Sequence, residues 1–215
     1  MSALAPVLAS EIPRRFTLKW LLGALRYAFI RVRTRLLLEA AISRLPQALP
    51  AIPVHYRFGD VSDIDRLSMV DPEYDEPAKR AARQRLAAGA QLVIGEYEGQ
   101  PVFSVWIMLG AIEAGSRRRP MPVSLTRAYS YKLHTAEAYR GRGVASGVYR
   151  FIAPMLAARG CTRLVCWISD RNTASVRMHL RSGFVPLATI YEIRLFGFWT
   201  LHWWGWNLRR RLRTG

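Results

Sequence analysis

A glycine- and arginine-rich run carries the clearest chemistry in this sequence. Residues 139–145 read Tyr-Arg-Gly-Arg-Gly-Val-Ala. Glycine adopts backbone dihedrals that a side chain forbids and lets a ligand approach the main chain closely. Apolar residues recur at helical spacing from Val144 onward, which indicates that the run opens a helix. Free N–H groups at a helix N-terminus, together with two arginines, suit a phosphate or pyrophosphate.

Further elements follow this turn at fitting distances. The apolar residues 164–168 predict a buried strand. Ser169, Asp170 or Asn172 can cap a second helix, which Gly183 is placed to end. The sequence therefore predicts the order strand, phosphate-type turn, helix, strand, helix, strand.

This order of parts resembles the GCN5-related N-acetyltransferase (GNAT) superfamily. In that family Arg or Gln, two residues, Gly, one residue and then Gly or Ala form the loop that holds the coenzyme A pyrophosphate; Arg140, Gly143 and Ala145 fit this pattern. The resemblance covers roughly residues 53–196. It implies direct transfer of an acetyl group from acetyl-CoA, or another acyl group from its acyl-CoA, to a primary amine. The cofactor contacts that it implies come from Leu133, His134, Thr135, Ala136, Arg140, Gly141, Arg142, Gly143, Val144, Ala145, Asn172 and Ser175.

The second helix contains one departure from the family pattern. Asn172, Gly183 and Phe184 match it, but position 179 is His where the family has the Tyr that protonates the departing thiolate. Histidine can also donate a proton. The resemblance therefore implies that His179 takes the general-acid role.

The sequence leaves the general base open. Tyr129 and Tyr131 occupy alternate positions of the strand before the turn, so they share one face. Tyrosine, with an ordinary pKa near 10, is a poor base at neutral pH. His134 and Glu137 are further candidates nearer the turn. His134 has a better-matched pKa, but regular alternation places it on the opposite face, and a hydrogen-bonded structural histidine is the alternative. The candidate catalytic residues are His179, Tyr129, Tyr131 and His134.

The sequence as a whole fits an α/β fold of the GNAT type. Strands are expected at 54–58, 91–96, 101–109 and 127–136, and helices at 62–69 and 77–88. They predict a mixed, mostly antiparallel sheet of six to seven strands with helices on both faces. We divide the chain into an N-terminal helical extension at 1–50, a GNAT acyltransferase domain at 51–198 and a Trp- and Arg-rich segment at 199–215.

The net charge of +17 is concentrated per residue at the two ends of the chain. Residues 1–50 hold eight basic and two acidic residues, net +6, and residues 199–215 hold four arginines and no acid, net +4. The stretch from Phe16 to Leu45 predicts an amphipathic helix that lies on an anionic membrane surface, because no apolar run in it is long enough to span the bilayer. The alternative is a helix that packs on the domain or on a second subunit of a homodimer.

Tryptophans gather near the C-terminus. Trp199, Trp203, Trp204 and Trp206 precede the final arginines, and tryptophan prefers the headgroup level of a membrane. The alternative is a last strand whose tryptophans complete a core. With no cleavable signal peptide expected, we predict a cytoplasmic protein held at the inner face of the membrane. Cys161 and Cys166 give neither a disulfide framework nor a metal-ligand pattern, so no metal is expected.

Acidic and basic residues of the chain bear on its possible partners and alternative activities. Seven acidic residues lie between positions 60 and 76, where they either attract a cationic amine or form a solvated face. No nucleic-acid-binding motif accompanies the basic charge, so nucleic acid is not an expected partner. One alternative activity is a long-chain N-acyltransferase served by an acyl carrier protein that docks on the basic surface. Another is a degenerate GNAT domain that acts as an adaptor. The intact pyrophosphate turn favours coenzyme A.

Overall fold

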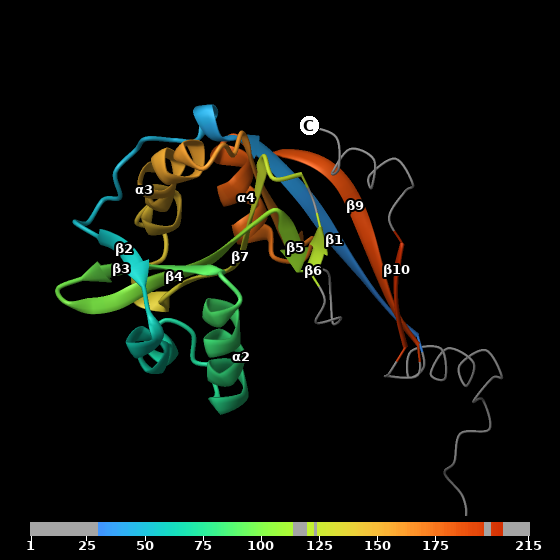
Figure 1. Ribbon diagram of the computed structural model, residues 1–215, viewed down its shortest axis with the longest axis horizontal. Coiled ribbons are helices and arrows are strands. Elements are labelled where there is room, and N and C mark those ends of the chain that lie inside the picture. The colour runs from blue at the N-terminus through green and yellow to red at the C-terminus, as the bar shows by residue number, and fades with distance from the viewer. Residues whose placement is uncertain (1–29, 114–119, 123, 196–198, 204–215) are drawn as a thin grey trace, which may run out of the picture.

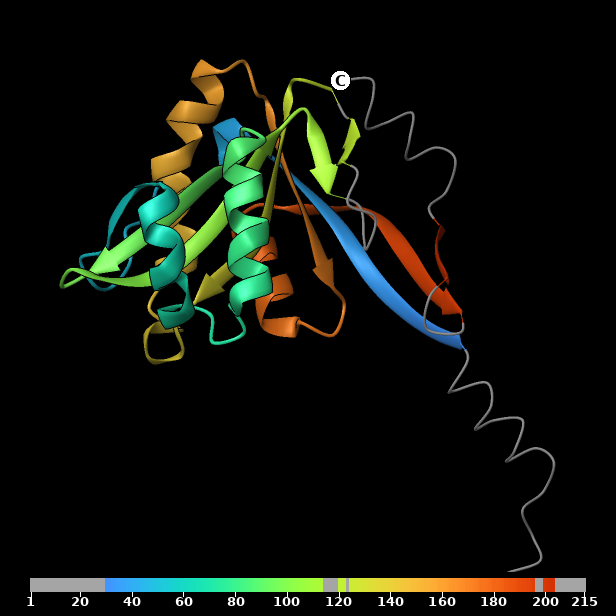
Figure 2. The same cartoon turned by 60° about the horizontal axis from the view of Figure 1, so that its bottom comes forward.

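A mixed eight-stranded sheet organises the protein. The computed structural model describes residues 30–113, 120–122, 124–195 and 199–203. Within them the strand order is β10-β9-β1-β8-β7-β4-β3-β2, and β5 pairs with β6 in a separate two-stranded sheet. The pair β7–β8 is parallel and the other pairs in the described sheets are antiparallel. Helices α3 and α4 cover one face of the large sheet, and α2 covers the other (Figures 1 and 2).

The described elements keep the order expected for the α/β fold. The strands are β1 (Ile30–Ala41), β2 (His55–Gly59), β3 (Gln91–Tyr97), β4 (Gln100–Leu109), β5 (Ala111–Glu113), β6 (Pro120–Pro122), β7 (Arg127–Thr135), β8 (Arg163–Ser169), β9 (Val185–Leu195) and β10 (Trp199–Trp203). The helices are η1 (Ile42–Arg44), η2 (Val61–Met69), α2 (Glu76–Ala87), η3 (Glu137–Tyr139), α3 (Val144–Ala158) and α4 (Thr173–Arg181), of which the η segments are 3₁₀ helices. The predicted mixed, mostly antiparallel sheet with helices on both faces is confirmed.

Strand β1 corrects the predicted N-terminal helix. The prediction extended one helix from Phe16 to Leu45, but Ile30–Ala41 form a strand between β8 and β9. The sequence Ile-Arg-Val-Arg-Thr-Arg at its start alternates with the period of two that a strand requires, and the helical interpretation used the wrong period. The part of the predicted helix before Ile30 lies outside the described residues.

The C-terminal segment is partly strand. Trp199–Trp203 form β10, which pairs antiparallel with β9. The backbone there agrees with the alternative prediction, in which this segment is the last strand of the domain. Residues 204–215 of the predicted segment lie outside the described residues. With β1 and β10, the sheet gains strands that the assigned domain boundaries at 51 and 198 left out.

Strand β1 joins the two cores of the protein. Adjacent strand residues point to opposite faces, and Leu37 and Leu38 are both fully buried. Leu38 belongs to the core beneath α3, together with Phe103, Val148 and Phe184. Leu37 belongs to the core between the sheet and α2, which we call the α2-side core. The strand that the sequence assigned to an extension is therefore central to the fold.

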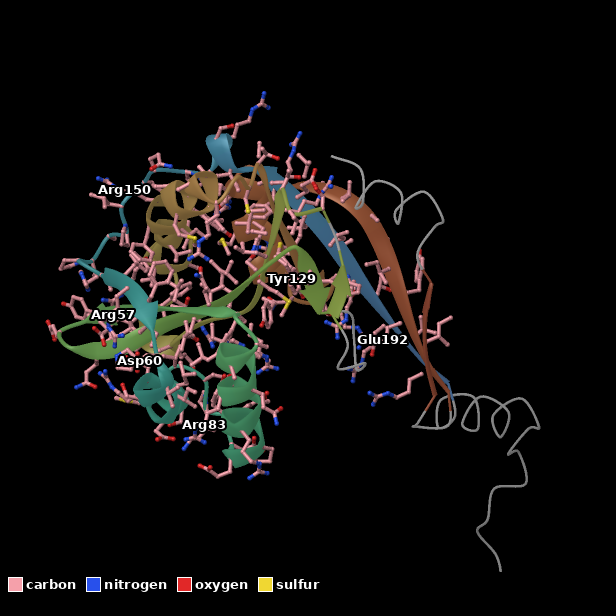
Figure 3. All side chains as sticks on the ribbon, in the orientation of Figure 1. Arg57, Asp60, Arg83, Tyr129, Arg150 and Glu192 are labelled. Carbon is pink, nitrogen blue, oxygen red and sulfur yellow. The ribbon has the colours of Figure 1, made fainter. Side chains whose placement is uncertain are left out.

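Beyond the end of β8, the strands β1, β9 and β10 continue as a ribbon. The last pair between β1 and β8 joins Arg35 and Ser169, whereas β1 and β9 remain paired out to Ile30 and Leu195. Figures 1 and 2 show this ribbon running away from the rest of the domain, and Figure 3 labels Glu192 on it. Glu192 is 3% exposed and accepts a hydrogen bond from Arg35 Nε at 3.3 Å. An ion pair thus joins β1 and β9 where the ribbon begins.

A buried charge network fixes η2 to the edge of the sheet. Two guanidinium nitrogens of Arg57 donate to the two carboxylate oxygens of Asp63, at 2.8 and 2.6 Å. Glu96 accepts further hydrogen bonds from Arg57 and from Arg66. Figure 3 shows Arg57 beside the start of η2, where Asp60 is the N-cap. Bidentate pairs of this kind are among the stronger side-chain interactions.

We expect Asp63→Asn to lower the free energy of unfolding by about 2 to 4 kcal/mol at pH 7. Breaking a buried ion pair costs ~3–5 kcal/mol of stability. The expected loss is smaller here because the Arg57 side chain is 30% exposed and water screens its charge. Hydrogen bonds from Arg57 hold the pKa of Asp63 below its ordinary value. The carboxylate therefore stabilises the fold above an unfolded-state pKa of about 3.9, and this contribution is lost as the pH falls through the lower folded-state pKa.

Urea unfolding at pH 7 and at successively lower pH measures this contribution. The difference between wild type and Asp63→Asn should shrink on acidification. Asp65→Asn is the matched control, since its side chain is 64% exposed and surface ion pairs contribute about 0–1 kcal/mol. Equal effects of the two substitutions would contradict the assigned role of Asp63.

Candidate active site

Strands β7 and β8 separate partway along their length. Their parallel pairing runs from Arg127 and Arg163 to Ser130 and Cys166, and β7 continues to Thr135. Beyond Ser130, the edge of β7 that faces β8 has no strand partner among the described residues. Backbone N–H and C=O groups need partners when they are removed from water, so such an edge is suited to bind an extended ligand.

A bulge in β7 changes which side chains share a face. Trp106 of β4 lies opposite Tyr131, and Ser104, two residues earlier, lies opposite His134. One residue of β4 therefore opposes two of β7, and Lys132 within the bulge has a positive φ of 48°.

The bulge corrects the expected position of His134. Residues paired across an antiparallel sheet share a face, and so do residues two apart on one strand. His134 thus lies on the same face as Tyr131, although regular alternation placed it opposite. Leu133, by contrast, packs against the core beneath α3. The face of β7 that looks toward α2 carries Tyr129, Tyr131 and His134.

Aromatic side chains line this face. Tyr129 and Tyr131 are 4% and 7% exposed, and their rings stack with centroids 5.0 Å apart. Figure 3 shows Tyr129 near the middle of the sheet. Tyr74 and Trp106 belong to the same α2-side core, and Trp167 packs against it from β8. Sequence reasoning missed these last three residues; for Trp106, the available signal was its position two residues from Ser104 in a strand next to β7.

His134 lies beside an acidic residue from the loop between η2 and α2. Its Nε2 atom is 3.5 Å from Oδ2 of Asp71. The His134 side chain is 41% exposed and that of Asp71 is 14% exposed. Burial lowers the pKa of His134, whereas Asp71 acts to raise it. The ring is therefore neutral at pH 7 and able to accept a proton.

The glycine-rich turn has the conformation that the sequence predicted. Gly141 and Gly143 have φ values of 76° and 75°, in the left-handed region that glycine adopts without strain. Gly143 is the N-cap of α3 and supplies no side chain to cap it. The first N–H groups of α3 therefore remain available to an anionic ligand, in the field of the helix dipole.

Neighbouring residues fix the turn in place. Ala51 N donates to the carbonyl oxygen of Arg142 at 2.9 Å, and the Tyr56 hydroxyl donates to that of Val144. Arg140 Nε donates to Thr135 O at 3.1 Å, which ties the turn to the end of β7. The unpaired part of the β7 edge is thus followed by η3 and then by the turn, and the hydrogen bond of Arg140 holds the turn against the end of the strand. The structure brings together the predicted cofactor residues of β7 and the turn.

A hydrogen bond joins Asn172 and Ser175 at the start of α4. Asn172 Oδ1 accepts a hydrogen bond from Ser175 N at 3.1 Å, which caps the helix. This is the helix-capping role that the sequence indicated for Asn172. Their contact with a cofactor stays a prediction.

His179 is a buried residue of α4. It is 2% exposed, and its ring packs edge-on against Phe184 with centroids 4.9 Å apart. Its Nδ1 atom lies 2.8 Å from the carbonyl oxygen of Ser175 and therefore donates to it. Burial lowers the pKa of the ring. Among the described residues its ring contacts Phe184 and Tyr149 of the core beneath α3, whereas Tyr129 and Tyr131 belong to the α2-side core.

Most of the acidic cluster at 60–76 has a structural role. Asp60 and Asp75 cap η2 and α2, Asp63 pairs with Arg57, and Asp65 pairs with Lys79 and Arg83. Asp71 differs from these residues because it faces a catalytic candidate. In residues 30–195, apart from the undescribed positions, no His, Cys, Asp and Glu side chains gather in a metal-binding group.

The divergent strands and the turn at the helix N-terminus define the fold of an acyl-CoA-dependent transferase. Residues 60–184, more than half of the chain, match the Acetyltransferase (GNAT) family. The chain belongs to this family.

One curated relative is the phosphinothricin N-acetyltransferase of Streptomyces coelicolor. It is 35% identical over 74 residues, which cover 34% of this chain and 43% of that enzyme. The matched segment thus spans less than half the length of the relative.

Two solved structures are similar in fold. A conserved protein of unknown function from Staphylococcus epidermidis gives a TM-score of 0.59 at 15% identity, covering 82% of this chain and 67% of the other. A putative GNAT acetyltransferase from Novosphingobium aromaticivorans gives 0.54 at 19% identity, covering 77% and 64%. These similarities support the GNAT fold.

Proposed function

We propose that this protein is an N-acetyltransferase that transfers an acetyl group from acetyl-CoA directly to a primary amine. The observation that carries the proposal is the unpaired edge of β7, which the short helix η3 joins to the uncapped N-terminus of α3. A strand edge suits the amide groups of pantetheine, and the helix N-terminus suits its pyrophosphate. The residues that would hold acetyl-CoA are Leu133 to Ala136 through their backbone and Arg140 to Ala145.

Acetyl-CoA would supply the acetyl group as a thioester, and the amine nitrogen bonds to the acyl carbon as the carbon–sulfur bond breaks. The amine loses one proton and the released sulfur gains one, so the products are an amide and free coenzyme A. We infer that the neutral ring of His134 takes the proton from the amine; its position on the α2-facing side of β7, beside Asp71, supports this role. Tyr129 and Tyr131 form part of the wall beside it.

The position of His179 supports a packing role. In its neutral form the ring proton is on Nδ1, because Ser175 O accepts it, and Nε2 then carries no proton to donate. Donation from Nε2 requires the imidazolium form, which burial disfavours. The general-acid role implied by the family pattern therefore requires His179 to be charged against the effect of its surroundings.

Acetyl-CoA binding tests the proposal directly. A ligand at 100 times its Kd stabilises a protein by about 2.7 kcal/mol, which should raise the Tm by about 5 to 10 °C. Gly141→Ala should weaken the binding of acetyl-CoA at least about 10-fold, because its methyl group occupies the space through which a phosphate reaches the backbone. Isothermal titration with acetyl-CoA gives the affinity.

Gly160→Ala is the matched control for this variant. Gly141 and Gly160 have φ values of 76° and 74°, and an added Cβ meets no atom within 4 Å at either position. Both substitutions carry a similar backbone strain of about 1–2 kcal/mol, but Gly160 lies after the end of α3, far along the chain from the turn. Equal affinities in the two variants would contradict the assigned site.

Activity is measured as thiol release from acetyl-CoA with added primary amines. Phosphinothricin is the first probe, because a relative bears its name. Stabilisation by an acyl carrier protein bearing its pantetheine arm, with no response to acetyl-CoA, would favour the long-chain alternative. Binding of acetyl-CoA without acetylation of any amine would favour the adaptor.

Membrane association stays a prediction. Among the described residues, no helix is long and apolar enough to span a membrane. Cosedimentation with phosphatidylglycerol-containing vesicles tests the prediction, and a truncation for this purpose must end before Ile30 so that β1 is kept. Equal cosedimentation with neutral vesicles would contradict an electrostatic contribution.

A further inference from the structure

Asp71 is held in one orientation by its own loop. Its backbone N–H donates to Leu67 O at 3.0 Å, and its carbonyl oxygen accepts from Tyr74 N at 3.0 Å. The side-chain oxygen Oδ1 accepts a hydrogen bond from Glu73 N at 3.1 Å. A carboxylate anchored through one oxygen points the other in a fixed direction, and here Oδ2 points at His134.

The burial of Asp71 distinguishes it from its acidic neighbours. Its side chain is 14% exposed, whereas those of Asp65 and Glu76 are 64% and 65% exposed and pair with surface cations. Charge interactions strengthen as water is excluded. Asp71 therefore affects His134 more than a surface carboxylate would.

We propose that Asp71 is a positioning residue for His134: it holds the ring with its Nε2–H directed at Oδ2, which leaves Nδ1 to accept the proton of the substrate amine. The proposal rests on the proposed function, in which His134 is the base. The distance of 3.5 Å is longer than a formed hydrogen bond, and catalytic hydrogen bonds often tighten when substrate binds. Once Nδ1 has taken the proton, the adjacent carboxylate stabilises the imidazolium.

Charges of both signs face His134. Asp71 and Glu73, from the loop between η2 and α2, favour its protonated form; Lys132 of β7 and Arg140 of the turn oppose it. Burial also favours the neutral ring. Without the charge of Asp71, Glu73 alone still favours the protonated ring, whereas the two cations and burial still favour the neutral ring. The pKa of His134 should then fall.

Imidazole NMR of the full chain tests the proposal without any acceptor. The chain contains four histidines, and the His134 signals are those that disappear in His134→Gln. In the wild type, the nitrogen shifts should show the Nε2–H tautomer. In Asp71→Asn, the titration midpoint of His134 should move to lower pH. Asn is isosteric and keeps an oxygen that can accept from Glu73 N, so the fold should be retained, and the Tm checks this.

Asp65→Asn is the matched control, because it removes a neighbouring acid that pairs with Lys79 and Arg83 rather than with His134. Its His134 titration should equal that of the wild type. Asp71→Glu keeps the negative charge, so the titration midpoint of His134 should stay close to its wild-type value. An unchanged midpoint and tautomer in Asp71→Asn would overturn the proposal.

Kinetics separate this proposal from the proposed function. With an amine that the protein acetylates, Asp71→Asn should lower kcat about 10- to 100-fold and leave the KM for acetyl-CoA within about twofold, as expected for an orienting partner of a general base. Adding Asp71→Asn to His134→Gln should cause no further loss, because Asp71 acts through His134. If His134→Gln leaves turnover unchanged, His134 is not the general base. If His134→Gln lowers turnover but Asp71→Asn does not, His134 remains the general base and Asp71 does not position it.

Discussion

His134→Gln is expected to lower kcat about 10²- to 10⁴-fold, the usual contribution of a general base, with little change in the affinity for acetyl-CoA. Glutamine preserves approximate size and hydrogen bonding but cannot take up a proton at neutral pH. The predicted cofactor contact at this position uses the backbone, which the substitution leaves in place. Steady-state kinetics and titration with acetyl-CoA give the two quantities separately.

The pH dependence of kcat/KM should also identify His134 as the general base. Burial holds the pKa of His134 below the ordinary value of about 6.5, so kcat/KM should fall as the pH drops through that lower value, and this limb should vanish in His134→Gln. His55→Gln is the control, since His55 lies exposed on β2 at the edge of the sheet. A variant at position 134 with full turnover and an unaltered pH profile would show that another group accepts the proton.

Leu38→Ala should destabilise the protein by about 2 to 5 kcal/mol. Leu38 has no exposed surface, and it lies in the part of β1 that pairs with strands on both sides. Truncation removes its contacts with the core beneath α3 and leaves a cavity. Urea unfolding followed by circular dichroism measures the loss.

Val32→Ala in the same strand is the matched control. Val32 is 51% exposed and, in the part of the chain that the structure describes, its strand partner is β9 alone, so its truncation should cost less than about 1 kcal/mol. Similar losses in the two variants would contradict a central position of β1. This comparison also tests the correction of the predicted N-terminal helix, because a surface helix would show no such contrast.

The sequence predicted the second half of the domain well, because its signals are local. Glycines at 141 and 143 match a turn with two positive φ values, and the apolar runs before and after it match β7, α3 and β8. The end of β7 at the turn followed from the same pattern. These features depend on the backbone dihedrals that single residues prefer and on the spacing of apolar residues within one element. Both can be inferred from a single sequence.

The failures depend on tertiary structure. The left-handed residue in the β7 bulge is Lys132, and no glycine or asparagine marked it, so the face of His134 was assigned wrongly. The exception is β1, whose arginines alternate with the period of a strand, although the stretch was interpreted with a helical period. Asp71 could not be distinguished from six nearby acids, because only the path of the loop brings it to β7.

The position of β1 also determines when the domain can become complete during synthesis. Its partners are β8 and β9, and Arg35 and Glu192, which form an ion pair, are 157 residues apart in the chain. Local units such as the β3–β4 hairpin can form as soon as they leave the ribosome, whereas β1 must wait for nearly the whole domain. Until then an apolar strand with two open edges is exposed. We therefore expect slow, late closure of the sheet, and a dependence on chaperones that a domain with the same strands in local order would not have.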